Sequence, residues 1–263
     1  MSGLSAIGSV NLLSVKQITR RFGGLLALNE VSFEVGVGQI AGLIGPNGAG
    51  KTTLLNIIGG QLAASSGAVA LAGQSLNHCA PHQVAALGVG RTFQNIRLFE
   101  ELSVLENVVL GRHLHQREGL SWLLPGRSQI ERQSRAQAQA LLEQLGMADL
   151  ADSEAGALAY GEQRRVEIAR ALALEPRLLL LDEPAAGMNA AETAQLAHFL
   201  QKLRASGLTL LVIEHDMDLI MRISDQVVVL NFGQVIADGP PDVVRADPAV
   251  VTAYLGDENG LSE

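Results

Sequence analysis

Gly45-Pro46-Asn47-Gly48-Ala49-Gly50-Lys51-Thr52 is the stretch of this sequence that decides the fold. It follows a short apolar run, Ile40 to Ile44, and leads into a segment with helical spacing, Lys51 to Ile58. A strand, a glycine-rich turn and a helix in this order match the Walker A pattern, whose backbone N–H groups wrap phosphates at a helix N-terminus. The alternative is a glycine-rich surface turn with an unrelated lysine, and the flanking strand and helix argue against it.

This turn predicts binding of ATP together with Mg²⁺. Lys51 would reach the β- and γ-phosphates, and the hydroxyl of Thr52 would be a ligand of Mg²⁺. The glycines allow the backbone to approach the phosphates closely. The nucleotide-binding residues expected here are Gly45, Pro46, Asn47, Gly48, Ala49, Gly50, Lys51, Thr52 and Thr53.

A second motif is an apolar run that ends in two carboxylates, Leu178-Leu179-Leu180-Leu181-Asp182-Glu183. It places Asp182 at the C-terminal edge of a buried strand, where α/β sheets bind ligands. Asp182 would belong to the Mg²⁺ shell, and Glu183 would polarise a water that attacks the γ-phosphate. Alone, such a run is most often only the end of a strand. Combined with a Walker A turn, it predicts nucleotide hydrolysis.

Strand-like and helix-like segments alternate along the chain, which implies a mostly parallel sheet covered on both faces. The predicted strands are Leu12 to Ile18, Glu30 to Val35, Ile40 to Ile44, Gly67 to Leu71, Leu178 to Leu181, Leu208 to Ile213 and a pair around Asn231-Phe232-Gly233. The predicted helices include Pro81 to Leu87, Ser103 to Leu114, Ser128 to Leu145, Gly161 to Leu174, Ala190 to Leu203 and a tail helix that begins at Asp247-Pro248 and ends at Gly256. Asn189 and Glu192 have the spacing of a capping box for the helix from Ala190.

The block from about Asn95 to Ala155 contains no strand pattern, so we interpret it as a helical subdomain inserted in an α/β core. A loop, Gly119 to Arg127, separates its two main helices. The predicted boundaries are 10–94 for the first part of the ATPase core, 95–160 for the helical subdomain, 161–240 for the second part of the core and 241–263 for a C-terminal helical tail.

Composition narrows the class of protein. The net charge of −8 argues against a nucleic-acid binder, and we interpret Arg164 and Arg165 as a solvated or ion-paired helix face. No apolar run approaches the roughly 20 residues that span a bilayer, and the first residues do not resemble a secretory signal. Cys79 is the only cysteine, which fits a reducing compartment. We therefore expect a cytoplasmic chain, with His113 and His115 as surface histidines.

The stretch Leu158-Ala-Tyr-Gly-Glu-Gln-Arg-Arg-Val-Glu-Ile-Ala-Arg-Ala-Leu172 precedes the carboxylate motif. On these motifs nearly the whole chain resembles the ATP-binding subunits of ABC transporters, and this stretch resembles their signature. The resemblance implies a P-loop NTPase core of the ABC ATPase kind with an additional antiparallel β subdomain. It also implies that the N-terminus of the signature helix contacts the γ-phosphate bound to the other subunit of a head-to-tail dimer, so that Ala159, Tyr160, Gly161 and Glu162 join the nucleotide-binding residues.

Three single residues gain expected roles from the same resemblance. Gln94 is similar to the Q-loop glutamine that links Mg²⁺ and water to the helical subdomain. His215 is similar to the switch histidine that contacts the γ-phosphate, and Phe22 to the aromatic that stacks on adenine. Without this context they would be an ordinary loop amide, a helix-start or metal-pair histidine and a core phenylalanine. The resemblance implies that Glu183, His215 and Gln94 serve in catalysis.

The chain departs from the usual Leu-Ser-Gly-Gly-Gln signature. Ala159 replaces the serine, Tyr160 the first glycine and Glu162 the glutamine. Because Ala159 has no hydroxyl, a contact across the dimer would have to come from backbone N–H groups near Gly161 and from the helix dipole. Asn189 likewise replaces the usual D-loop aspartate; it can still cap the next helix.

Four stretches together resemble the ATPases of bacterial branched-chain amino-acid importers; they are the Leu158 to Gly161 signature, Arg91 to Phe99, Glu183 to Asn189 and Asp247 to Gly256. The resemblance implies a second ATPase subunit, identical or a sibling, two membrane permease subunits and, indirectly, a substrate-binding protein. It places the chain peripherally on the cytoplasmic face of the inner membrane. Alternatives are a related system for urea, an amide or lipopolysaccharide, and a soluble non-transport ABC ATPase. A P-loop kinase or GTPase would lack the signature helix.

Overall fold

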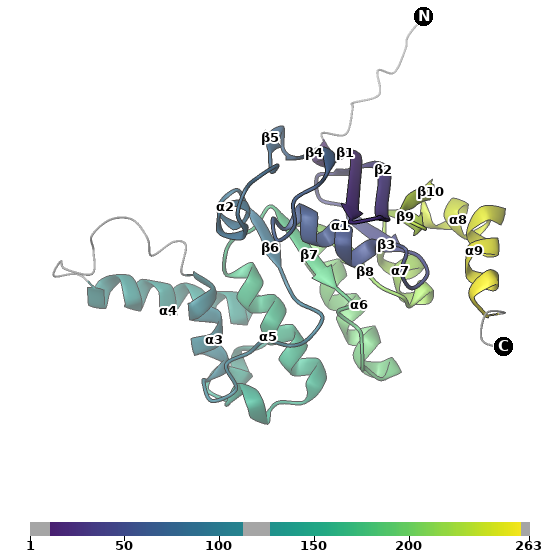
Figure 1. The fold of residues 1–263 in the computed structure, drawn as a ribbon. Helices are drawn as coiled ribbons and strands as arrows, with labels where there is room; N and C mark the ends of the chain where they lie inside the picture. Colours follow the sequence, from purple (N-terminus) through teal and green to yellow (C-terminus); the bar gives the residue numbers. More distant parts are fainter. Residues whose placement is uncertain (1–10, 113–126, 259–263) are drawn as a thin grey trace, which may run out of the picture.

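The computed structural model describes residues 11–112 and 127–258, whose strands form two sheets (Figure 1). The larger sheet has the strand order β10-β9-β3-β8-β7-β6, and the smaller has the order β2-β1-β4-β5. The strands are β1 (Asn11–Phe22), β2 (Leu25–Gly36), β3 (Ile40–Ile44), β4 (Ser66–Leu71), β5 (Gln74–Ser75), β6 (Val89–Arg91), β7 (Leu178–Asp182), β8 (Thr209–Ile213), β9 (Gln226–Asn231) and β10 (Gln234–Gly239). The helices are α1 (Lys51–Ile58), α2 (Pro81–Ala86), α3 (Val104–Gly111), α4 (Arg127–Gln144), α5 (Tyr160–Leu172), α6 (Ala190–Ala205), α7 (Met217–Ile223), α8 (Pro241–Arg245) and α9 (Pro248–Glu258).

The larger sheet is mostly parallel, as predicted. Along β9-β3-β8-β7-β6 each strand is parallel to the next, and β10 adds an antiparallel edge strand beside β9. Every residue of β3, β7 and β8 is buried, which explains their continuous apolar sequences. Alternate side chains enter different cores: Leu178 and Leu180 face the smaller sheet and α1, whereas Leu179 and Leu181 pack with α6 and α7.

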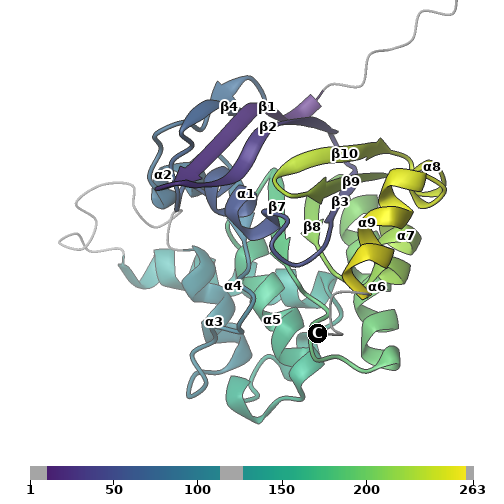
Figure 2. The same cartoon turned by 45° about the vertical axis from the view of Figure 1, so that its right-hand side comes forward.

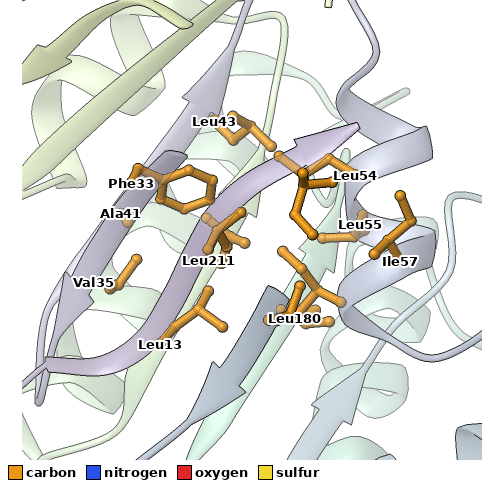
Figure 3. Close-up of a cluster of buried hydrophobic side chains, with 14 of the residues drawn as sticks. Leu13, Phe33, Val35, Ala41, Leu43, Leu54, Leu55, Ile57, Leu180 and Leu211 are labelled. Carbon is orange, nitrogen blue, oxygen red and sulfur yellow. The ribbon is translucent and has the colours of Figure 1, made fainter. Parts of the chain in front are cut away.

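The smaller sheet is the predicted antiparallel β subdomain. Its main strands, β1 and β2, extend beyond the predicted ranges and meet at the Gly23-Gly24 turn. Figure 3 shows Leu13 and Phe33 of this sheet packed over Leu54 of α1 and Leu211 of the larger sheet. The shared core fixes the smaller sheet against the helix that follows the glycine-rich turn.

The helical part is built from α3, α4 and α5, which lie together on one side of the molecule in Figures 1 and 2. Helix α5 contributes to two cores, because Val166 and Ala169 pack with α3 and α4 while Ile168 and Leu172 pack beneath the larger sheet. Helix α3 begins after Ser103, whose side chain caps it, and ends at Gly111, before the predicted Leu114. His113, His115 and most of the predicted loop at 119–127 lie outside the described residues.

At the opposite side, α8 and α9 pack against β9 and β10 (Figure 2). Asp247 caps α9 as predicted, accepting from the N–H of Ala249 at 2.8 Å. The predicted end at Gly256 is wrong, because the helix continues to Glu258. A glycine disfavours a helix interior by only about 1 kcal/mol, so it ends a helix only where the backbone also turns left-handed. Among the described helices, none has the length and hydropathy needed to cross a bilayer.

Candidate active site

The glycine-rich turn between β3 and α1 depends on glycine at defined positions. Gly45 has φ of 149°, and a Cβ there would lie 2.0 Å from the carbonyl oxygen of Leu230. Gly50, with φ of 102°, is the N-cap of α1 and offers no side-chain acceptor to the first turn. That turn also carries no acidic residue, so its N–H groups and the positive end of the helix dipole are directed at an incoming anion.

Lys51 is the first residue of α1 and is 8% exposed. Its Nζ atom donates to the carbonyl oxygens of Gly45 at 2.6 Å and Pro46 at 2.9 Å. The ammonium group is therefore held over the turn by backbone dipoles. A phosphate that approached the turn would meet both the N–H groups and this positive charge.

A cavity of about 410 Å³ opens beside the turn. It is lined by Phe22, Leu25, Leu26, Ala27, Asn47, Gly48, Ala49, Gly50, Lys51, Thr52, Thr53, Glu183 and Phe232. The structure thus brings Phe22, most of the turn and Glu183 to one place. The ring of Phe22 is 44% exposed, and the guanidinium carbon of Arg20 lies 4.5 Å from its centroid.

Phe232 is a second aromatic at this cavity that the sequence interpretation missed. It is 88% exposed and has φ of 44° in the turn between β9 and β10. The N–H of the next residue, Gly233, donates to the carbonyl of Ala49, and its carbonyl accepts from the N–H of Asn29; the first bond ties this turn to the glycine-rich turn. The available signal was a large apolar residue at a turn position, where it has no core to enter.

Asp182 ends β7, and its side chain is nearly buried. Burial raises the pKa of this carboxyl, and the Arg91 guanidinium, 3.5 Å away, opposes that rise. Arg91 also donates to the side chain of Asn56 on α1 at 2.8 Å. It therefore connects the end of β7 to the helix that follows the glycine-rich turn.

Glu183, the next residue, has a left-handed backbone with φ of 47°. Non-glycine residues in this region store about 1–3 kcal/mol of strain, and such strain is concentrated at functional sites. Glu183 lines the cavity beside the glycine-rich turn, and its Oε2 atom accepts a 2.8 Å hydrogen bond from Nε2 of Gln94.

His215 lies just past β8, the neighbour of β7 in the sheet. The N–H of Glu183 donates to the carbonyl of Ile213 at 2.9 Å, so the two strand ends are in register. The His215 side chain is 65% exposed, with Nδ1 3.6 Å from a carboxylate oxygen of Glu214. Glu214 is fully buried, which raises its pKa, and it accepts from the N–H of Ala185 at 2.7 Å.

The residues at the start of α5 do not line the cavity beside the glycine-rich turn. Ala159 is the N-cap without a side-chain hydrogen bond, and Glu162 accepts from its N–H at 3.2 Å. Ala159, Gly161 and Glu162 line a cavity of about 210 Å³ that has no lining residue in common with the cavity beside the glycine-rich turn. Among the described residues, the start of α5 and the glycine-rich turn of the same chain therefore line two different cavities.

Comparison with known proteins identifies the family. Residues 28–186, more than half of the chain, match the family model described as "ABC transporter". The chain belongs to the ABC transporter family of ATP-binding proteins.

Residues 234–259 match a second model, "Branched-chain amino acid ATP-binding cassette transporter". The high-affinity branched-chain amino acid transport ATP-binding protein BraF of Pseudomonas aeruginosa is 45% identical over 94% of this chain and 98% of its own length. The corresponding LivG protein of Escherichia coli is 46% identical with the same coverage.

Two solved ATP-binding cassettes of ABC transporters have the same fold. One, described as an ADP conformation, has a TM-score of 0.82 and 32% identity over 94% of this chain and 99% of its own. A nucleotide-free cassette has a TM-score of 0.80 and 32% identity over 93% of this chain and 98% of its own. The ABC ATPase fold predicted from the motifs is confirmed.

One interpretation of this ABC chain needs correction. Arg164 does not belong to a solvated helix face, because its side chain is fully buried. It is ion-paired, as the other half of that interpretation held, with Glu167 at 2.8 Å. Arg165 is partly exposed and lies 4.0 Å from Glu162. A charged pair on a helix is normally solvated, so the sequence contained no signal for a buried arginine.

Proposed function

We propose that this chain is the ATP-hydrolysing subunit of an importer for branched-chain amino acids. The names of the P. aeruginosa and E. coli relatives and the match of residues 234–259 support this solute class. The observation that carries the enzymatic part is the cavity beside the glycine-rich turn, into which Glu183 projects while bound to Gln94.

ATP binding follows from the geometry of this cavity. Phe22 would stack on the adenine, and backbone N–H groups among residues 47–53 would hold the phosphates. Lys51 would exchange its two carbonyl partners for phosphate oxygens, which are stronger acceptors because they are charged.

The residues present fit Mg²⁺. Asp182 is a nearly buried carboxylate at the end of β7, a strand that contacts α1, and Thr52 carries a hydroxyl in the first turn of α1; oxygen ligands of this kind suit a hard divalent cation. Thr52, Asp182 and the amide oxygen of Gln94 would hold it. When bound, the cation neutralises charge on the β- and γ-phosphate oxygens.

Hydrolysis would begin with a water held by Glu183. Its carboxylate accepts a proton from that water, and the Gln94 hydrogen bond fixes its orientation. His215, at the end of the adjacent strand, would donate to the γ-phosphate.

A second subunit would complete the site. The start of α5, from Ala159 to Glu162, lies in a cavity separate from the nucleotide cavity, as a head-to-tail dimer requires. Closure of that dimer around ATP would move the helical part and, through the segment after Gln94, the permease subunits bound to it. Hydrolysis would then allow the dimer to reopen.

Reconstitution of the full complex tests this proposal. The chain, its permease subunits, its partner ATPase and the binding protein would be placed in proteoliposomes loaded with ATP, and uptake of labelled leucine, isoleucine and valine would be measured. We expect ATP-dependent uptake of at least one of them and none with Lys51→Ala. Stimulation of ATPase turnover by urea or another solute, with none by the three amino acids, would contradict the assigned solute.

A further inference from the structure

The side chain of Arg164, on α5, is fully buried, with a relative exposure of 0%. Its Nη1 atom donates to the carbonyl oxygen of Phe93 at 2.8 Å and to Glu167 at 2.8 Å. Its Nη2 atom donates to the carbonyl oxygen of Gln94 at 2.7 Å. One guanidinium therefore binds the backbone carbonyls of two consecutive residues, Phe93 and Gln94, and the side chain of Gln94 contacts Glu183.

The same guanidinium also reaches the beginning of α5. Nη2 lies 3.3 Å from the hydroxyl of Tyr160, and the guanidinium carbon is 5.9 Å from the centre of the Tyr160 ring. The ring also borders Gly187, where a Cβ would lie 3.4 Å from it. Tyr160 is 41% exposed, so part of it is available to a second subunit.

We propose that Arg164 is a positioning residue that couples the start of α5 to the Gln94–Glu183 contact. A shift of Tyr160, imposed by nucleotide on a partner subunit, is transmitted through the guanidinium to the backbone of Gln94. The inference rests on the proposed function, because it requires Gln94 and Glu183 to act in hydrolysis.

The chemistry of the pair favours this role over simple packing. A buried ion pair is costly to desolvate, and apolar residues of similar volume often replace one without loss of stability. Burial raises the pKa of Glu167, and Arg164 opposes this rise. The Nε atom of Arg164 has no hydrogen-bond partner among the described residues, which adds to the cost. What an apolar pair cannot supply is the rigid fork that holds the two carbonyls together.

Arg112 provides a matched control. It is also buried, pairs with Glu175 at 3.1 Å and donates to a backbone carbonyl, that of Ala173 at 3.4 Å. Its Nε atom likewise has no partner among the described residues. Unlike Arg164, it does not hydrogen-bond to the backbone of Phe93 or Gln94 within the part of the chain that the structure describes.

The test compares the double variant Arg164→Met/Glu167→Leu with Arg112→Met in the reconstituted complex. The double variant removes both charges, so it leaves no unpaired buried carboxylate. We expect it to keep ATP affinity within about twofold and to lower kcat by about tenfold or more, because it alters orientation rather than binding. Arg112→Met should leave kcat within about twofold of the unmodified chain.

A second comparison excludes a merely structural effect. In a Gln94→Ala background, the double variant should lower kcat no further, because the contact it positions is already gone. A kcat within about twofold of normal, or losses that multiply in the Gln94→Ala background, would overturn the inference.

If the double variant does not fold, the variant Tyr160→Phe tests the inference in its place. This variant removes only the hydroxyl that accepts from Arg164, at a half-exposed site. It should lower kcat a few-fold, because Arg164 would then hold the backbone of Gln94 less firmly. An unchanged kcat would overturn the inference.

The variant Glu183→Gln distinguishes failure of the proposed function from failure of the coupling through Arg164. If Glu183→Gln turns over ATP normally, the proposed catalytic assignment fails. If it is inactive while the Arg164 variants are normal, only the coupling fails.

Discussion

The side-chain amide of Gln94 donates to the carboxylate of Glu183 at 2.8 Å, although 89 positions separate the two residues in the sequence. Parallel pairing of β6 with β7 creates this proximity, and it continues one residue past the end of β6 through the hydrogen bond from the N–H of Thr92 to the carbonyl of Leu180 in β7. The segment that leaves the core for the helical part thus begins in contact with the Glu183 carboxylate.

Removal of this contact should affect the rate rather than binding. In Gln94→Ala the Glu183 carboxylate loses the donor that orients it, so we expect kcat to fall about tenfold while ATP affinity stays within about twofold. Steady-state ATPase kinetics with a separate nucleotide-binding assay measure both. Gln201→Ala, an exposed glutamine on α6, is the control. A loss of ATP affinity as large as the loss of kcat would contradict a role in orienting Glu183.

Lys51 should contribute to nucleotide affinity. Lys51→Ala removes charge-assisted hydrogen bonds to phosphate worth about 1.5–3 kcal/mol, so ATP should bind about 10- to 100-fold more weakly. Titration calorimetry measures the change, and Lys202→Ala, on the exposed side of α6, should leave affinity unaltered. Retained affinity in Lys51→Ala would refute binding at this turn.

The cap of α5 offers a gain in stability. Ala159 has N-cap geometry, with φ of −60° and ψ of 151°, but no side-chain acceptor. A serine there would accept from the first turn and stabilise the protein by about 1 kcal/mol, which corresponds to a Tm increase of about 2–4 °C. Ala190→Ser should give no such increase, because Asn189 already caps α6. An unchanged Tm for Ala159→Ser would show that the cap gains nothing from a hydroxyl.

Glu214 should make stability depend on pH. Burial raises its pKa in the folded state, so the stability linked to its neutral form is fully present below the unfolded pKa and is lost as pH rises through the folded pKa. Glu214→Gln removes this loss. Its unfolding free energy relative to the unmodified chain should therefore increase from acidic pH to pH 8, by about 1.4 kcal/mol for each unit of pKa shift. Urea unfolding across this range measures the difference, and a difference that is constant with pH would contradict the assignment.

The features that the sequence predicts well are those whose signal is local. The buried strand β7 is a continuous apolar run, and the turn at 45–52 has glycine at the positions where φ is positive, so both could be placed without tertiary information. The capping box of Asn189 and Glu192 forms as predicted. The parallel order of the larger sheet followed from the alternation of strands and helices.

The features that were missed depend on partners distant in the sequence. Strand β6 has only three residues, one of them Gly90, and exists because it pairs with β7. The buried state of Arg164 depends on carbonyls some 70 residues away. Phe232 reaches the cavity beside the glycine-rich turn only because the β9–β10 turn lies against that turn. Such placements follow from packing, which no local pattern contains.

The central claim is that Glu183 activates water for ATP hydrolysis that powers transport. Glu183→Gln keeps the size of the side chain and an oxygen that can accept from Gln94, but it cannot take a proton. ATP turnover of the full complex carrying this variant is the most direct measurement. We expect ATP affinity within about twofold of normal and turnover reduced at least about 100-fold; near-normal turnover would contradict this role of Glu183.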